Sequence, residues 1–231
     1  MGSQYSGIKH LAIIPDGNRR WAKAKGWTLR KGYRHAGDFE RLRKIYKECE
    51  GLRINTLSIW AFSTENWNRS GEEKKIVFET ISEGLDSMKK KADEDGLRFM
   101  HIGRKDRLPG YLTKKIKNLE NATKDNKKIV FVVGIDYGGN DEILRAVNRA
   151  IKSKKKNING KDFRNFLDTK EIPDPDLIIR TSGEKRLSGY MPFQSSYAEL
   201  FFLKKNFPEL STGDIKKVVS EFNRRKRRFG N

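Results

Sequence analysis

The chain has 231 residues, which is enough for one domain with a substantial core. Hydrophobic and charged residues each make up 35%, but aromatic residues reach 10%, so the composition excludes a disordered chain and indicates a folded protein with a polar surface. The formal net charge is +20, from 50 Lys and Arg against 30 Asp and Glu, and it favours an anionic partner. Nucleic acid, anionic lipid and phosphorylated metabolites all fit, and so does a merely solvated Lys-rich surface.

Cysteine content and hydropathy exclude two further classes of protein. The single Cys49 excludes an internal disulfide framework and is typical of a reducing cytosol, where we interpret it as a packed thiol. No apolar run approaches the roughly 20 residues that span a bilayer. The first apolar run covers only Leu11–Pro15, so we expect no signal peptide.

Short apolar runs alternate with longer amphipathic ones along the chain. The runs predicted to be strands are Leu11–Ile14, Thr56–Phe62, Leu97–Ile102, Ile129–Ile135, Leu177–Ile179 and Leu200–Leu203. Each is short and mostly apolar, as is typical of strands covered on both faces.

The segments between the strands carry apolar stripes with helical spacing. The stripes are Phe39, Leu42, Ile45 and Tyr46; Val77, Ile81, Leu85, Met88 and Ala92; Leu112, Ile116 and Leu119; Ile143, Leu144, Val147 and Ile151; and Ile215, Val218, Val219 and Phe222. We interpret all five as core-facing, and we expect Ser211 or Thr212 to cap the last helix. The alternation predicts an α/β fold, with a central, mainly parallel six-stranded sheet flanked by helices. We expect one domain over residues 1–231, with residues 1–7 as a flexible tail.

The first polar cluster, Pro15–Trp21, directly follows the first predicted strand, where ligands of parallel sheets gather. Gly17 permits a tight turn, and the helix that begins there presents free N–H groups to an anion. Arg19 and Arg20 add positive charge, while Asp16 could hold a divalent cation that bridges the carboxylate and a phosphate. A helix cap with a surface ion pair explains the segment equally well.

Two further clusters also follow strands. Phe62–Arg69 combines hydroxyls, an amide, a carboxylate, two aromatic rings and an arginine, although a capped helix start with a packed Trp67 would look similar. Arg180–Ser188 surrounds small residues with three cations, which favours a phosphate or diphosphate pocket. Basic loops are common, so neither cluster identifies a site by itself.

Familiar catalytic motifs are absent from the sequence. It contains no P-loop, no G-x-G-x-x-G fingerprint and no G-x-S-x-G elbow. Its three histidines lack zinc-ligand spacing. There is also no Asp-Asp-x-x-Asp run, so a diphosphate site in this chain must depend on arginines, backbone amides and few carboxylates.

Taken in order, these clusters resemble the cis-prenyltransferase family, whose best-known member is undecaprenyl diphosphate synthase. The matching motifs are His10–Ala22, Ala61–Arg69, Tyr137–Gly139, Asp176–Arg186, Gln194–Glu199 and Arg227–Gly230. The similarity runs from about residue 8 to the C-terminus with motif order and spacing preserved. The form of the first motif looks more like archaeal members. Tyr33 stands near an expected histidine, Lys185 where histidine is frequent and Phe193 where tryptophan is frequent.

The resemblance implies a role for each matched position. Asp16 would be the central catalytic carboxylate, coordinating Mg²⁺ and assisting departure of the allylic diphosphate, and Asn66 would act with Ser63 near the reacting carbons. Glu199 would share the magnesium, from across a dimer. The remaining implied positions are Gly17, Asn18, Arg19 and Arg20 for the allylic diphosphate; Trp21 at the mouth; Phe62, Glu65, Trp67 and Arg69 around the site; Arg180, Arg186 and Ser188 for isopentenyl diphosphate; and Arg228 and Gly230, which reach toward the partner's substrate.

The implied protein is a Mg²⁺-dependent cis-prenyltransferase that extends a farnesyl or geranylgeranyl diphosphate starter with isopentenyl diphosphate. Its product would be a Z-polyprenyl diphosphate, a lipid-carrier precursor for glycan synthesis. The resemblance also implies a cytoplasmic homodimer, and the basic exterior would help it visit the membrane surface.

Three alternatives stay open. The same fold could make a short product or prenylate another acceptor. It could be a catalytically inactive regulatory subunit, although retention of Asp16, Asn66 and Arg180 favours an enzyme. A basic nucleic-acid-binding protein is the third, but no recognised motif supports it, and we expect no nucleic-acid partner.

Overall fold

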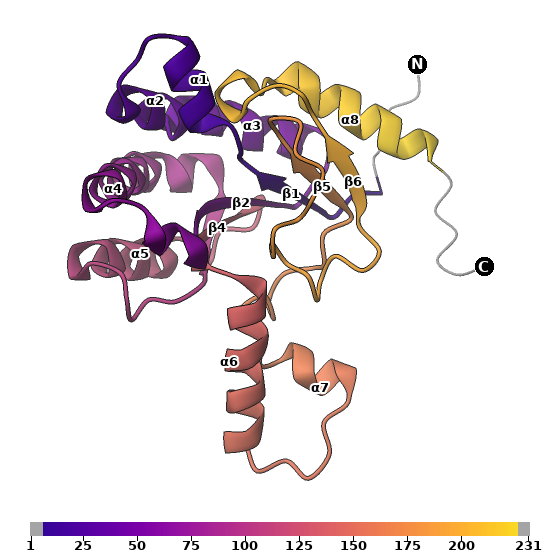
Figure 1. Cartoon of the computed structure of the whole chain (residues 1–231). Coiled ribbons are helices and arrows are strands. Elements are labelled where there is room, and N and C mark those ends of the chain that lie inside the picture. The colour runs from indigo at the N-terminus through magenta and orange to yellow at the C-terminus, as the bar shows by residue number, and fades with distance from the viewer. Residues whose placement is uncertain (1–6, 226–231) are drawn as a thin grey trace.

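The computed structural model describes residues 7–225 and is built around one sheet of six parallel strands (Figure 1). The strands are β1 (His10–Ile14), β2 (Thr56–Ser63), β3 (Leu97–Ile102), β4 (Ile129–Tyr137), β5 (Leu177–Arg180) and β6 (Glu199–Phe202). Their order across the sheet is β3-β4-β2-β1-β5-β6, and every neighbouring pair is parallel. All six predicted strands and the α/β class are confirmed. The expected N-terminal tail lies outside the described residues apart from Gly7.

Helices lie in every connection between successive strands except that from β5 to β6, and, up to residue 225, two more follow β6. They are α1 (Asn18–Ala24), α2 (Leu29–Ala36), α3 (Phe39–Gly51), η1 (Thr64–Asn68), α4 (Gly71–Asp95), α5 (Gly110–Thr123), α6 (Gly139–Lys152), α7 (Gly160–Arg164), η2 (Phe207–Glu209) and α8 (Thr212–Arg224). Ser211 caps α8 as predicted, because its side chain accepts a hydrogen bond from the backbone N–H of Asp214.

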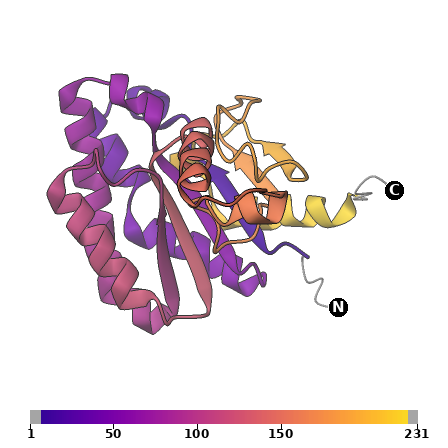
Figure 2. The same ribbon diagram turned by 90° about the horizontal axis from the view of Figure 1, so that it is seen from below.

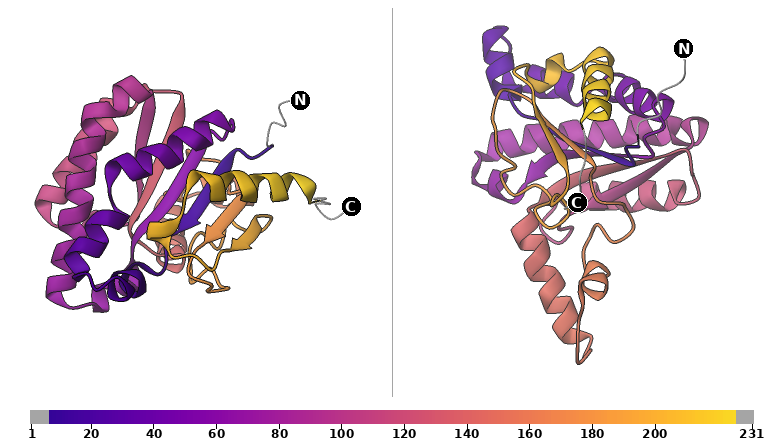
Figure 3. Two further views of the ribbon diagram at one scale, coloured as in Figure 1. Left: turned by 90° about the horizontal axis from the view of Figure 1, so that it is seen from above. Right: turned by 90° about the vertical axis from the view of Figure 1, so that its right-hand side faces the viewer.

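The main core lies between the sheet and one layer of helices. Apolar side chains of α3, α4, α5 and α8 pack there against the alternate residues of the strands. Figure 2 shows α4 and α5 running along one side of the sheet. The left view of Figure 3 shows α8 lying across β1, β5 and β6, and α3 packs beside it against β2 and β4. Four of the five predicted stripes therefore face the core.

The opposite face of the sheet is covered mainly by irregular chain. A second cluster packs there, in which Tyr190 stacks on Trp60 with ring centroids 4.9 Å apart, and Met191 is fully buried beside them. Tyr190 and Met191 follow Ser188 closely in the sequence, so their packing holds the polar cluster Arg180–Ser188 against the sheet. Every strand is thus covered on both faces, as its apolar sequence predicted.

The stripe on α6 corrects one prediction. Leu144 is 64% exposed and Ile151 70% exposed, and Val147 between them is also exposed. α6 projects from the body as an arm with α7 beside it, and it buries its other face through Glu142, Ala146 and Ala150 (Figures 1 and 3). The helical period was right, but the pattern cannot distinguish a stripe that faces its own core from one that faces a partner.

Two histidines are buried among the strands. The His10 ring contacts the Ser58 hydroxyl oxygen at 2.8 Å, and the His101 ring contacts the Ile135 carbonyl oxygen at 2.9 Å. Burial lowers the pKa of each histidine from 6.5 to about 4, because the charged form loses its hydration.

Within residues 7–225, the structure has no helix that is both long and apolar enough to cross a bilayer.

These histidines predict how stability depends on pH. Between pH 6.5 and 4 the unfolded chain binds protons that the folded chain does not, so the free energy of unfolding is expected to fall as pH falls through this window. The loss is at most about 3 kcal/mol per histidine. Urea unfolding at several pH values measures it. The His10→Gln, His101→Gln double variant should lose most of this slope, and an unchanged slope would contradict the assignment.

Candidate active site

A polar cleft opens at the carboxyl ends of the strands, where β1, β2 and β5 run into their loops. Its free volume is about 1830 Å³, counting the space open to solvent. The predicted site residues that line it are Asp16, Gly17, Asn18, Arg19, Arg20, Ser63, Glu65, Asn66, Arg69, Arg180 and Ser188. Three clusters that are far apart in sequence therefore meet in one place.

The turn after β1 places the Asp16 carboxylate in this cleft. Gly17 has φ +91°, and a Cβ there would lie 2.2 Å from the Asn206 side-chain oxygen, so only glycine fits. The Gly17 N–H donates to Asp16 Oδ1 at 2.7 Å. The Thr181 hydroxyl, fully buried after β5, accepts from the Asp16 N–H at 2.8 Å. Sequence reasoning assigned Thr181 no role, yet it fixes the turn from the neighbouring strand.

Arg180 joins the first and third clusters. Its side chain is buried at the end of β5, and its Nη2 donates to Asp16 Oδ2 at 2.9 Å. Its Nη1 donates to the Ser188 hydroxyl at 2.7 Å and to the Arg186 carbonyl. Within the described chain, the buried Nε of Arg180 has no hydrogen-bond partner. One guanidinium thus fixes the carboxylate and the loop that follows β5, and it keeps one donor unused.

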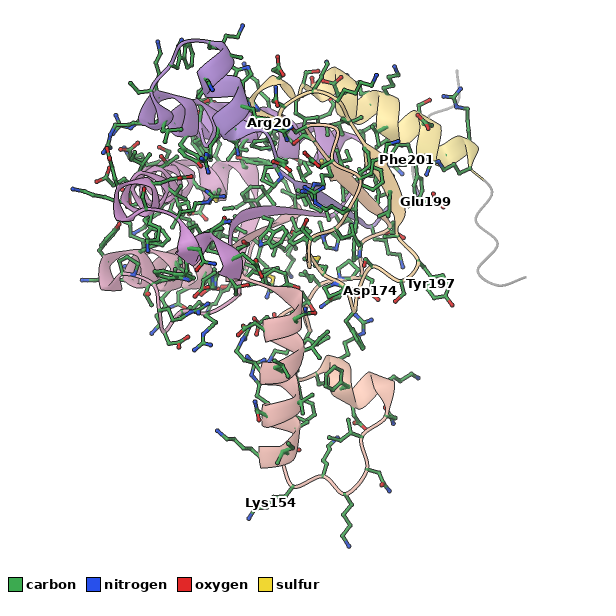
Figure 4. The ribbon with its side chains drawn as sticks, viewed as in Figure 1. Arg20, Lys154, Asp174, Tyr197, Glu199 and Phe201 are labelled. Atoms are coloured by element: carbon green, nitrogen blue, oxygen red, sulfur yellow. The ribbon has the colours of Figure 1, made fainter. Side chains whose placement is uncertain are left out.

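Two long arginine side chains at the start of α1, those of Arg19 and Arg20, lie near the Asp16 carboxylate. Arg20 Nη2 lies 3.8 Å from Asp16 Oδ1 and 3.2 Å from Glu184, and the Arg20 side chain is 56% exposed. The Arg19 side chain is also exposed. Figure 4 shows Arg20 above the carboxyl edge of the sheet. Both arginines can therefore turn toward an anion that enters the cleft.

The second cluster supplies the opposite wall. η1 begins directly after β2, and the Asn66 side-chain oxygen accepts from the Ser63 N–H at 3.2 Å. Trp67 faces away from the cleft, and its indole N–H donates to Asp136 at 2.8 Å. This contact holds η1 against the end of β4, so Asn66 and Ser63 stay at the cleft surface.

Tyr33 of α2 lines both the polar cleft and an apolar cavity that adjoins it. The sequence did not predict it as a site residue. Its hydroxyl donates to Glu73 at 2.7 Å and accepts from Arg69 at 3.0 Å. Burial raises the pKa of Tyr33 well above its ordinary value of 10, so the hydroxyl stays protonated. The only sequence signal was a departure from the family pattern at this position.

Several predicted site residues lie elsewhere. Trp21 and Phe62 are buried, and Trp67 is partly buried, so all three support the cleft without lining it. Arg186 is exposed and pairs with Glu184 at 2.7 Å, and only its carbonyl contacts Arg180. Arg228 and Gly230 lie outside the described residues.

Glu199 lies at the other end of the sheet in this protomer. It opens β6 and pairs in register with Leu177, whereas Arg180 pairs with Phe202. Glu199 therefore lies three residues, or about 10 Å along the strands, from the level of Arg180. Glu199 accepts from Arg225 at 2.6 Å, and Figure 4 shows it on the side of the molecule formed by β6, far from Arg20. Asp16 and Glu199 do not meet within one protomer.

An apolar cavity continues below the cleft. It runs between the sheet and helices α2, α3 and α4, with a free volume of about 800 Å³ counting the space open to solvent, and it shares Pro15, Asn18, Tyr33 and Ala61 with the cleft. Its deeper walls include Val77, Leu85, Met88 and Phe131. Part of the predicted α4 stripe therefore lines a cavity while it also packs in the core.

The polar cleft and the apolar cavity together form a site for an amphiphilic substrate. Cations and the carboxylates of Asp16 and Glu65 line a cleft that adjoins an apolar cavity, which suits a substrate with an anionic head and a hydrocarbon tail. Among residues 7–225, no group of three or more His, Cys, Asp or Glu side chains could by itself hold a metal ion. Any metal here must take most of its ligands from substrate and water.

Comparison with known proteins identifies the family. Residues 14–230 match the family model described as "Putative undecaprenyl diphosphate synthase". An isoprenyl transferase of Aquifex aeolicus is 41% identical over 222 residues, covering 96% of this chain and 95% of the relative. A tritrans,polycis-undecaprenyl-diphosphate synthase (geranylgeranyl-diphosphate specific) of Picrophilus torridus is 38% identical, covering 96% of this chain and 89% of the relative.

A solved structure agrees. The lavandulyl diphosphate synthase of Lavandula x intermedia, in complex with dimethylallyl diphosphate, has a TM-score of 0.92 and 31% identity, covering 97% of this chain and 98% of that one. The chain belongs to the undecaprenyl diphosphate synthase family of prenyltransferases. It is a prenyl-transferring enzyme of cis-prenyl chain elongation, in a family that generally depends on magnesium.

Proposed function

We propose that this enzyme condenses isopentenyl diphosphate with a farnesyl or geranylgeranyl diphosphate starter and releases a Z-polyprenyl diphosphate, a lipid-carrier precursor. The observation that carries the proposal is the Asp16–Arg180 pair, joined at 2.9 Å in a polar cleft that shares four lining residues with the apolar cavity. The polar cleft accommodates diphosphates, and the cavity accommodates the starter's hydrocarbon chain.

The two diphosphates bind to different walls of the cleft in this proposal. Arg180 and Ser188 bind isopentenyl diphosphate, and Arg186 turns away from Glu184 to join them. The backbone of Gly17 and the side chains of Arg19 and Arg20 bind the allylic diphosphate. The allylic chain then passes Tyr33 and Ala61 into the apolar cavity, because both residues line the two spaces.

The residues fit a magnesium ion that is brought in with substrate. Asp16 offers one carboxylate, and its side chain is 32% exposed. Mg²⁺ is commonly held by one or two carboxylates together with substrate phosphates and waters. In this role the ion would neutralise the diphosphate that leaves. Asp16 would hold the ion, and Glu199 of the partner subunit would complete the carboxylate set.

The reaction breaks the allylic C–O bond, and the diphosphate leaves with the electron pair. The double bond of isopentenyl diphosphate attacks the allylic carbon, and a proton is lost from the condensed product. Arg19 and Arg20 stabilise the negative charge that develops on the leaving group. Asn66 and Ser63 orient the two reacting carbons on the wall formed by η1.

Incorporation of label tests this function. The enzyme is incubated with labelled isopentenyl diphosphate, Mg²⁺ and either farnesyl or geranylgeranyl diphosphate, and organic-soluble label is counted. We expect incorporation with at least one starter and its loss in EDTA. Absence of incorporation with dimethylallyl, geranyl, farnesyl and geranylgeranyl diphosphate alike would overturn the proposal.

We also propose a homodimer that uses the exposed stripe of α6. Leu144, Val147 and Ile151 form a continuous apolar face on a helix that projects from the body. Tyr197, 67% exposed beside β6, adds an aromatic ring on the side that carries Glu199 (Figure 4). A second copy would cover these apolar surfaces and could bring Glu199 to the cleft of its partner.

A charge in this stripe is expected to separate the dimer. Leu144→Asp buries a carboxylate at the interface and should weaken dimerisation by about 2 kcal/mol or more, which is about 30-fold in Kd. Sedimentation velocity at several concentrations measures this. Tyr111→Asp places the same charge at an exposed aromatic position of α5 and should leave the assembly unchanged. A Leu144→Asp protein whose dimer dissociation constant equals that of the wild type would contradict the assigned surface.

The net charge of +20 supports a further part of the proposal, that the enzyme visits an anionic membrane surface to deliver its product. Co-sedimentation with vesicles containing anionic lipid should then exceed that with neutral vesicles and weaken with added salt. Equal binding to both vesicles would contradict it.

A further inference from the structure

The side wall of the apolar cavity is a seam between α2 and α4. On the inside, Ala36 of α2 and Ile81 of α4 line the cavity. On the outside, the two helices are joined by the ion pairs Arg30–Glu79 and, one turn further along, Arg34–Glu83 at 2.6 Å. All four of these side chains are between 32% and 52% exposed. Exposed ion pairs contribute little to stability, so they hold this wall weakly.

Two glycines, Gly37 and Gly84, face each other at the end of the seam nearest the C-terminus of α2. Gly37, which follows α2, lies against Thr80, because an added Cβ would be 2.6 Å from the Thr80 methyl group. A Cβ added to Gly84 would find only the Gly37 carbonyl oxygen within 4 Å, at 3.6 Å. The two backbones therefore approach each other closely, and the space beside Gly84 is otherwise open. The large side chain that borders the cavity at this level is that of Phe39, at the start of α3.

A groove lies on the outer side of this wall. It has a free volume of about 990 Å³, counting open solvent, and it shares Gly37, Phe39, Thr80 and Gly84 with the apolar cavity. The wall between the two spaces is thus one residue thick. Ser87, one turn beyond Gly84, and the exposed Lys90 and Lys91 also line the groove.

The floor of the cavity is closed much more firmly. Met88 and Leu85 of α4 and Phe131 of β4 are each at least 95% buried there. Displacing well-packed core side chains costs about 1–3 kcal/mol or more for each group that is forced in. The Gly37–Gly84 end of the α2–α4 seam offers the cheaper route, because exposed ion pairs and a glycine contact hold it. The partly buried Tyr33–Glu73 hydrogen bond joins the two helices at the other end of the seam.

We propose that this seam is a lateral opening through which the far end of a growing prenyl chain leaves the cavity, passing between Gly37 and Gly84 into the outer groove. The inference rests on the proposed function and specifies where that reaction places its longer products. Short chains stay inside, and chains that exceed the cavity extend to the surface beside Ser87. Gly84 is then a residue that determines product length.

A reporter in the outer groove tests binding without turnover. Ser87→Cys carries an environment-sensitive dye, and labelling is specific because Cys49 is fully buried and burial raises the pKa of its thiol to about 12. Undecaprenyl diphosphate should shift the dye emission to the blue, whereas farnesyl diphosphate should not. Gly51→Cys, at an exposed position that lines neither space, is the control. If undecaprenyl diphosphate competes with farnesyl diphosphate for the enzyme but leaves the Ser87 dye unchanged, the inference is overturned.

A plug in the seam tests the effect on the product. Gly84→Leu fills the opening from α4, and we expect its products to be shorter than those of the wild type by at least one isoprene unit in mass spectra. Gly51→Leu adds the same side chain in open space and should leave the product distribution unchanged. Thermal unfolding of both variants verifies their folding. Wild-type products in Gly84→Leu would overturn the opening alone, whereas a wild-type enzyme without any product would overturn the proposed function instead.

Discussion

Asp16→Asn is expected to lower kcat by about 10³-fold, the size of effect seen when a group that stabilises transition-state charge is removed. The amide keeps an oxygen that can accept from the Gly17 N–H, so the turn after β1 is preserved. The change removes the carboxylate charge that would hold Mg²⁺ against the leaving diphosphate. It also removes the charged partner of Arg180, which stays anchored through Ser188. Steady-state kinetics at saturating substrate measure the effect.

The control for this variant is another aspartate in an arginine pair. Asp174 accepts from both Nη atoms of Arg164, at 2.5 and 2.6 Å, on a part of the surface well away from Arg20 in Figure 4. Asp174→Asn should leave kcat unchanged. Both variants are expected to shift Tm by less than about 4 °C, because each lies near the surface. Asp16→Asn with wild-type kcat would remove the central carboxylate from the mechanism.

Arg180→Lys should raise the KM for isopentenyl diphosphate by about 30-fold, equivalent to about 2 kcal/mol of charge-assisted hydrogen bonding. Lysine keeps the positive charge but loses the planar fork that contacts Asp16, Ser188 and the Arg186 carbonyl at once. The substrate then loses the geometry of its binding site more than its electrostatic attraction. We expect kcat to change less than KM.

Arg164→Lys is the matched control, because it disrupts another hydrogen-bonded arginine–carboxylate pair, outside the cleft. Its KM values should equal those of the wild type. If Arg180→Lys leaves the KM for isopentenyl diphosphate unchanged and raises only that for the allylic starter, Arg180 binds the other diphosphate and the proposed division of the cleft is wrong.

The sequence predicted the sheet well because its strands are short apolar runs between clear polar turns. It also predicted that polar clusters after β1, β2 and β5 meet, since the carboxyl ends of parallel strands share one edge. Asp16, Asn66 and Arg180 do line one cleft. The order of strands across the sheet could not be read from the pattern, because it depends on crossovers that periodicity does not encode.

Other features depend on tertiary contacts. Tyr33 and Thr181 reach the site through one hydroxyl each, and no local pattern distinguishes such a hydroxyl from a surface one. The exposure of Leu144 follows from the direction in which α6 leaves the body. Glu199 matches the family motif, but its position at the opening of β6 places it away from Asp16 in the protomer, which only the strand register reveals.

The most direct test compares products of the wild type and Asp16→Asn side by side by mass spectrometry, with isopentenyl diphosphate, Mg²⁺ and each starter. The wild type should yield a series of diphosphates that differ by single isoprene units, and Asp16→Asn should yield almost none at equal enzyme concentration. An equal series from both proteins would show that prenyl transfer does not depend on the carboxylate that Arg180 holds in the cleft.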